Sequence, residues 1–88
     1  METIKGKTAD GFEFEFDKEN IDMECLDLMG ELDENPFKVG KILKIILGSE
    51  QQKKLYDSLR NERGHVPPEK VMNAFRDILQ TNNESKNS

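Results

Sequence analysis

The side chains that could do chemistry are few, and they lie far apart in the sequence. His65 is the single histidine of the chain and Cys25 is the single cysteine. A zinc site takes three or four such ligands, and neither residue has a second one near it in the sequence. Cys25 falls on the apolar stripe of a predicted helix, which indicates a small core residue rather than a nucleophile. We therefore predict no metal site.

The acidic and hydroxyl residues form no catalytic motif. The segment DLMGELDEN lacks the ligand spacing and the central glycine of a calcium-binding loop. No serine has a Gly-x-Ser-x-Gly context, and no glycine-rich phosphate loop occurs. Asp33 and Glu34 fall at a solvated helix end, where paired acid–base catalysis is not expected. We predict that the protein is not an enzyme, has no catalytic residue and binds no cofactor.

The charge is divided unevenly along the chain. Residues 1–35 carry three lysines and twelve acidic residues, a net of −9, whereas residues 36–88 carry ten basic and six acidic residues, a net of +4. Such a molecule could attach head to tail to its own copies or bind a charged partner. Alternatively, the two halves neutralise each other within one fold. No basic stripe carries interleaved aromatic residues, so we predict no nucleic-acid binding.

Length and composition narrow the possibilities further. The 88 residues are enough for one small domain, which we place at residues 1–80. One cysteine excludes an internal disulfide and suits a reducing compartment. No segment reaches the roughly 20 apolar residues of a membrane span, so we expect no membrane contact. The N-terminal METIKGK has no apolar core of a signal peptide.

The first element must be a β-hairpin over about residues 2–17. Phenylalanines alternate with acidic residues in GFEFEFD, the period expected of a half-buried strand. A three-residue loop, residues 9–11 with Gly11 at positive φ, sets Ile4 opposite Phe16. The same loop also pairs Lys5 with Glu15 and Lys7 with Glu13. A lone hairpin is marginally stable in water, so helices or another chain must cover its apolar face.

Helices follow the hairpin. We predict them over about residues 18–32, 36–47, 50–61 and 68–80, from apolar residues that recur at helical spacing. Asn35 before Pro36 indicates a helix start and Gly48 a helix stop. The polar segment TNNESKNS, residues 81–88, is predicted to be a disordered tail. The expected fold is therefore α+β and mostly α, with a hairpin followed by four short helices in a compact bundle.

The helix over residues 36–47 has more apolar surface than one buried stripe needs. On a helical wheel its core arc contains Val39, Ile42, Leu43 and Ile46. The opposite arc holds the residues that we predict to be available to a partner: Phe37, Lys38, Lys41, Lys44, Ile45 and, near the border, Leu47. Either a neighbouring element covers the apolar excess, with the lysine stems alongside, or the excess binds a partner.

A resemblance covers roughly residues 11 to 79. The turn Asp33-Glu34-Asn35-Pro36, the junction Leu47-Gly48-x-Glu50-Gln51, and Leu59-Arg60 followed by Gly64-x-Val66-Pro67 carry it. On these motifs the chain resembles the small tail assembly chaperones of long-tailed phages and prophages of Gram-positive bacteria.

The resemblance implies a function. Such proteins bind the aggregation-prone tape measure protein in the host cytoplasm until the tail tube assembles around it, and they are not part of the mature virion. A longer frameshifted form contacts the tail tube protein. Two other classes remain open: an acidic inhibitor that mimics DNA phosphates, and a minor structural phage protein. Self-association is expected if the three hairpin phenylalanines stay uncovered.

Overall fold

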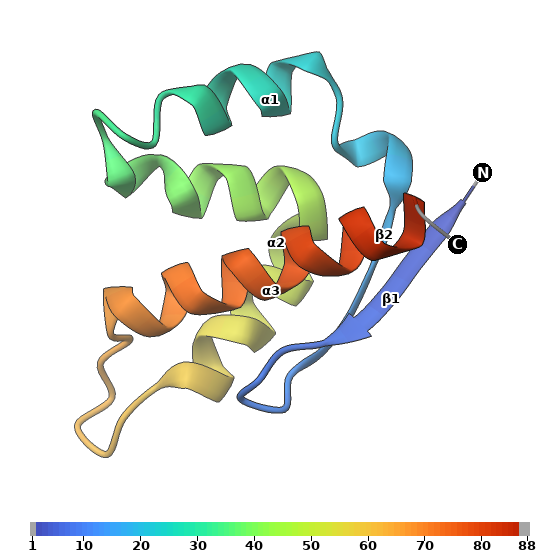
Figure 1. Ribbon diagram of the computed structural model, residues 1–88. Helices are drawn as coiled ribbons and strands as arrows, with labels where there is room; N and C mark the ends of the chain where they lie inside the picture. The colour runs from blue at the N-terminus through green and yellow to red at the C-terminus, as the bar shows by residue number, and fades with distance from the viewer. Residues whose placement is uncertain (1, 87–88) are drawn as a thin grey trace.

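The computed structural model describes residues 2–86, the last four of them by their backbone alone. An antiparallel hairpin is followed by a helical part whose elements cover one face of the hairpin (Figure 1). The strands are β1 (Thr3–Lys7) and β2 (Glu13–Asp17), and two short 3-10 helices are η1 (Lys18–Asn20) and η2 (Pro36–Lys38). The α-helices are α1 (Met23–Gly30), α2 (Val39–Leu59) and α3 (Pro68–Lys86).

The predicted hairpin register is confirmed. Ile4 pairs with Phe16 and Lys5 with Glu15, in strands joined through a loop that contains Gly11 at φ 94°. The Thr8 amide donates to the Phe12 carbonyl (2.9 Å), which closes the three-residue loop. Alternation therefore places the apolar residues of the hairpin on one face, because side chains of a strand point to opposite sides in turn.

The hairpin's apolar face is covered by helices of the same chain. Ile4, Phe14 and Phe16 are buried, and the two phenylalanine rings stack at 6.1 Å between centroids. α3 packs beside β1, while α2 packs beside β2. A methyl group at Gly6 would meet Phe14 Cζ and Thr81 Cγ2 at 2.8 Å each, so the glycine permits this close approach. Phe12, the third hairpin phenylalanine, is half-buried against the same core, so the uncovered face on which the expected self-association depended is not present in the described hairpin.

A glutamine side chain attaches the outer edge of the hairpin to α2. The Glu15 amide donates to Gln51 Oε1 (2.9 Å), and Gln51 Nε2 donates to the Glu15 carbonyl (2.6 Å). The same Nε2 also donates to the Leu47 carbonyl (2.8 Å). Gln51 therefore satisfies backbone groups of β2 that face away from β1, as a third strand would.

Over residues 2–86 the structure has three α-helices rather than the predicted four. The second and third predicted helices form one element, α2, which is kinked at Gly48 (φ 84°, ψ 163°). The sequence located the break correctly, because this backbone conformation is open to glycine and strained for other residues. The helix axis changes direction at the break, so α2 supplies two differently oriented surfaces (Figure 1).

The predicted start of the first helix is also corrected. Residues 18–20 form η1 instead of α-helix, and α1 begins at Met23. The reason is two successive caps: the Asp17 carboxylate accepts from the Glu19 amide, and the Asp22 carboxylate accepts from the Cys25 amide. An aspartate at an N-cap satisfies an amide that has no helical partner, so each one starts a new helix.

The predicted disordered tail was wrong for residues 81–86. α3 continues to Lys86, six residues beyond the predicted end at Gln80. Thr81 Oγ1 donates to the Asp77 carbonyl (2.9 Å), and Asn82 is buried. Its amide oxygen Oδ1 has no hydrogen-bond partner among the described residues. Polar composition hid this extension, because the segment meets the hairpin through a threonine, Thr81, which lies close to Gly6. Residues 87–88 of the predicted tail lie outside the described residues.

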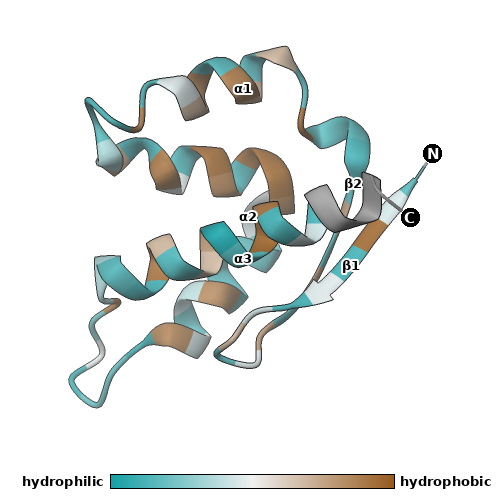
Figure 2. Cartoon of the chain, in the orientation of Figure 1, coloured by the Kyte–Doolittle hydropathy of each residue, from teal (hydrophilic) through white to brown (hydrophobic). Residues whose placement is uncertain are grey.

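One core joins the hairpin and the helices. Figure 2 shows that the first half of α2 carries many of the apolar residues of the chain. The buried apolar side chains are Ile4, Phe14, Phe16, Cys25, Val39, Ile42, Leu43, Ile46, Leu47, Leu55, Leu59, Val71, Ala74, Phe75 and Ile78. The first half of α2 lies in the middle of this core, with α1 and α3 packed against it. This central position explains why residues 39–47 are the most apolar segment of the chain.

Candidate functional site

The sequence-predicted partner residues do not share one environment. Phe37 is 90% exposed and Ile45 is 36% exposed, and Lys41 and Lys44 are exposed as well. Leu47 is buried in the core, so its assignment to a partner surface was wrong; it lies on the side of α2 that the fold covers. Lys38 is half-buried, and its Nζ lies 3.0 Å from a carboxylate oxygen of Glu31. We call Phe37, Lys41, Lys44 and Ile45 the α2 ridge.

Local sequence positions the α2 ridge. The Asn35 carboxamide oxygen accepts from the Phe37 amide (3.2 Å), and Pro36 starts the 3-10 turn with a fixed φ. Phe37 is thus held on an ordered turn with its ring outside the core. Residues 37, 41, 44 and 45 then recur at one-turn spacing, which places them along one face. The opposite face of the same turns holds Ile42, Leu43 and Ile46, each 0% exposed.

A second apolar surface lies beside the ridge and was not predicted. It is a groove of about 320 Å³ between η2, both halves of α2 and the start of α3. We call it the α2–α3 groove; it is lined by Pro36, Phe37, Val39, Gly40, Tyr56, Val66, Pro68, Val71 and Met72. Phe37 belongs to both surfaces, whereas the wall formed by Val66, Pro68 and Met72 belongs to the groove alone.

Gly40 lets the two halves of α2 approach each other at the groove. A methyl group there would meet the Tyr56 hydroxyl at 2.9 Å. Gln52 Nε2 donates to the Gly40 carbonyl and lies 3.2 Å from the Tyr56 hydroxyl oxygen. These contacts fix the kinked helix in one shape. The Tyr56 hydroxyl and the Gly40 carbonyl are thus polar atoms in an otherwise apolar groove.

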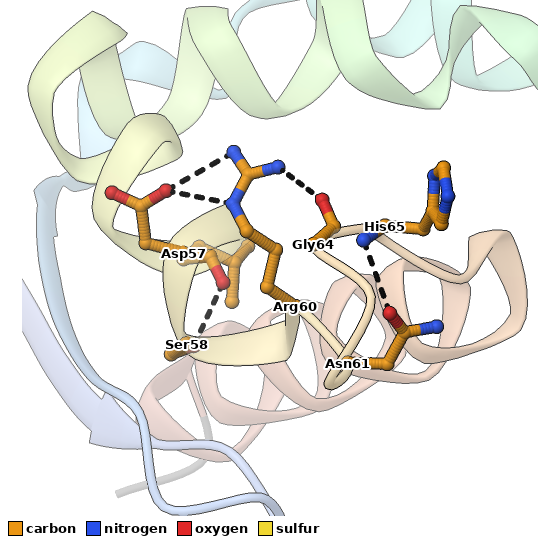
Figure 3. A network of polar contacts seen from close by, with 7 residues as sticks. Asp57, Ser58, Arg60, Asn61, Gly64 and His65 are labelled. Atoms are coloured by element: carbon orange, nitrogen blue, oxygen red, sulfur yellow. Dashed lines mark hydrogen bonds and ion pairs between the residues drawn. The ribbon is translucent and has the colours of Figure 1, made fainter.

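A network of polar contacts orders the loop that carries Val66 (Figure 3). Two atoms of the Arg60 guanidinium contact Asp57 Oδ1: Nε donates a hydrogen bond (3.1 Å), and Nη2 lies 3.1 Å from the same oxygen. The third nitrogen, Nη1, donates to the Gly64 carbonyl (2.9 Å). Asn61 Oδ1 accepts from the His65 amide (3.1 Å). The loop is therefore held by side-chain contacts rather than by a longer helix, and this places the last wall of the groove.

Cys25 and the side chains that could hold a metal ion are the remaining candidate groups. Cys25 is fully buried; burial, and secondarily the carboxylate of Asp22, raise the pKa of its thiol and favour the unreactive protonated form. Among the described side chains, no three of His, Cys, Asp or Glu come together where they could hold a metal ion. Over residues 2–86, no helix combines the length and the apolar character needed to cross a membrane.

Comparison of the chain with protein-family models, with curated proteins and with solved structures found no match. The surfaces described above and the sequence motifs are therefore the features that indicate a function.

Sequence reasoning missed the groove because it is formed by segments that are distant in the chain. Pro68 was predicted only as the start of the last helix, and Val66 was noted only as part of the Gly64-x-Val66-Pro67 motif. One signal was present: Gly40 interrupts an otherwise continuous helix-forming segment, and a glycine inside a helix often marks a close approach. Its partner in that approach, Tyr56, could not be identified from spacing alone.

Proposed function

We propose that this protein is a phage tail assembly chaperone that binds the tape measure protein and keeps it soluble until the tail tube assembles. The single observation that carries the proposal is the exposure of Phe37. A 90% exposed phenylalanine on an ordered turn, followed by Ile45 along the same ridge, is apolar surface that the fold itself does not use.

The chemistry of the α2 ridge fits an apolar helix as the bound partner. Aromatic and aliphatic side chains can enter the apolar face of an amphipathic helix, as in other helix-binding proteins. Lys41 and Lys44 carry apolar stems and a charged end, so they add contact area while keeping the free protein soluble. A holding function needs such a surface and no catalytic group.

The family resemblance supplies the rest of the proposal. The protein acts in the cytoplasm of the bacterial host and is not part of the mature virion. A longer form of the chain engages the tail tube protein. The motifs for this resemblance coincide with structural features: Asn35 and Pro36 form the turn that presents Phe37, and Gly48 forms the kink of α2.

Co-expression tests the proposal. A tape measure protein from the genome that encodes this chain should be largely insoluble alone, and it should become soluble and co-purify when the two are produced together. An unrelated acidic protein of similar size, produced at the same level, is the control. A tape measure protein that stays insoluble with both proteins would refute the proposed function.

A further inference from the structure

The outer face of α1 carries apolar side chains that no part of the described chain covers. Met23 is 66% exposed and Leu26 is 48% exposed. They are three residues apart, so they lie next to each other on one face of the helix. The buried face of α1 points the other way and holds Cys25, which is fully buried. We call Met23 and Leu26 the α1 knob.

The α1 knob is surrounded by negative charge. Glu24 and Asp27 are exposed on the same helix, and the four ion pairs among the described side chains use neither of them. Glu31, at the end of the helix, is already paired with Lys38. The knob is thus a short apolar stripe with free carboxylates beside it.

The α2–α3 groove is complementary to the knob. Its lining is apolar, and basic residues lie one helical turn from it: Lys41 after Phe37, Lys44 after Gly40, and Lys53 before Tyr56. These lysines are exposed, and none takes part in an ion pair among the described side chains. The groove therefore offers apolar contact inside and positive charge outside, whereas the knob offers apolar contact and negative charge.

One molecule cannot bring its own knob to its own groove. α1 and α3 both pack on α2, and Figure 1 shows them on opposite sides of its first half. The groove lies on the α3 side. α1 is held in its place by the buried Cys25 and by the Glu31–Lys38 ion pair. Only a second molecule can supply the knob that fills the groove.

We propose that the α2–α3 groove binds the α1 knob of a second copy of this chain, so that the protein associates head to tail. The two surfaces differ, so each copy keeps one free knob and one free groove, and the contact propagates into rings or open chains. One eight-residue helix covers less than the roughly 800 Å² per partner of a stable complex, so the association is weak and concentration-dependent.

Two variants test the contact without touching Ile45 or Phe37. Leu26→Glu removes the apolar knob from an exposed helix position. Pro68→Glu places a carboxylate on the groove wall, at an exposed first-turn position of α3 where an acidic residue suits the helix dipole. Gln80→Glu, an exposed position on the later part of α3, is the charge-matched control. Thermal melts establish that all three variants fold.

The measurement is the weight-average mass by light scattering over a concentration series. The wild type and Gln80→Glu should exceed the mass of one chain at high concentration, and added salt should reduce this excess. Each knob or groove variant alone should weaken association about tenfold or more. A mixture of Leu26→Glu and Pro68→Glu should associate at high concentration, but no further than pairs, because one chain has an intact groove and the other an intact knob.

Three results would overturn the proposal. The wild type could remain a single chain at all concentrations. Both variants could associate as the wild type does. The mixture could remain at the mass of one chain although each variant is folded, which would show that knob and groove do not meet.

Discussion

The hairpin and the α2 ridge both carry apolar side chains, but the fold buries those of the hairpin and leaves those of the ridge exposed. Both are short segments with more apolar side chains than they can bury alone. The hairpin's Ile4, Phe14 and Phe16 are buried beneath α2 and α3, whereas Phe37 and Ile45 on the ridge stay exposed. The helices therefore cover the apolar residues of the hairpin, and this burial stabilises the fold. The ridge is left open by the same set of helices, which is why we assign it to a partner.

The largest expected effect separates two adjacent isoleucines. Ile46→Lys should destabilise the protein by about 4 kcal/mol or more and unfold it, because Ile46 is fully buried and its place offers a charge no partner. Ile45→Lys should cost about 1 kcal/mol or less, since its side chain can reach solvent beside Lys41 and Lys44. Chemical denaturation of both variants gives the comparison. Equal losses would show that the ridge belongs to the core.

A smaller loss is expected where α3 meets the hairpin. Gly6→Ala should destabilise by about 1–3 kcal/mol, because the added methyl group would lie 2.8 Å from Phe14 Cζ and Thr81 Cγ2. Gly30→Ala is the matched control: no atom lies within 4 Å of a methyl group at this exposed helical position. That change should stabilise by about 0.4–1 kcal/mol. If both substitutions act alike, the contact between α3 and β1 is not tight.

Truncation of the C-terminus tests the same contact between α3 and the hairpin, with a smaller expected loss of stability. Removing residues 81–88 takes away Thr81, which packs near Gly6, and the buried Asn82. We expect a loss of about 1 kcal/mol, which corresponds to a melting temperature lower by about 4–8 °C in a domain of this size. Removing residues 84–88 instead keeps both side chains and is the control. If removal of residues 81–88 leaves the melting temperature unchanged, these residues do not contribute to the stability of the fold.

The sequence was sufficient for features that depend on neighbours in the chain. The register of the hairpin followed from alternation and from Gly11, and the position of the kink followed from Gly48. The cap at Asn35 and Pro36 was also predicted, although it starts the 3-10 helix η2 and the α-helix begins only at Val39. Each depends on backbone preferences that act over a few residues, so spacing alone decides them.

Features that depend on distant segments could not be predicted. The tail was assigned to disorder because nothing in its composition shows that Thr81 meets Gly6. Leu47 was placed at the border of the ridge, although α2 presents it to the core. The groove was not predicted because Tyr56 and Val66 reach it from segments that are distant in the chain from Phe37. In each case tertiary packing, rather than local propensity, decided the outcome.

The central claim is that the α2 ridge is spare to the fold and binds the partner, and one substitution tests it directly. Phe37→Ser should leave the free energy of unfolding within about 0.5 kcal/mol of the wild type, because the ring is 90% exposed. Gln80→Ser changes another exposed side chain, which lies outside the α2 ridge, the α2–α3 groove and the α1 knob, and is the control. We expect co-expressed tape measure protein to stay soluble with the control and to become insoluble with Phe37→Ser. Full solubilisation by a folded Phe37→Ser variant would contradict the account.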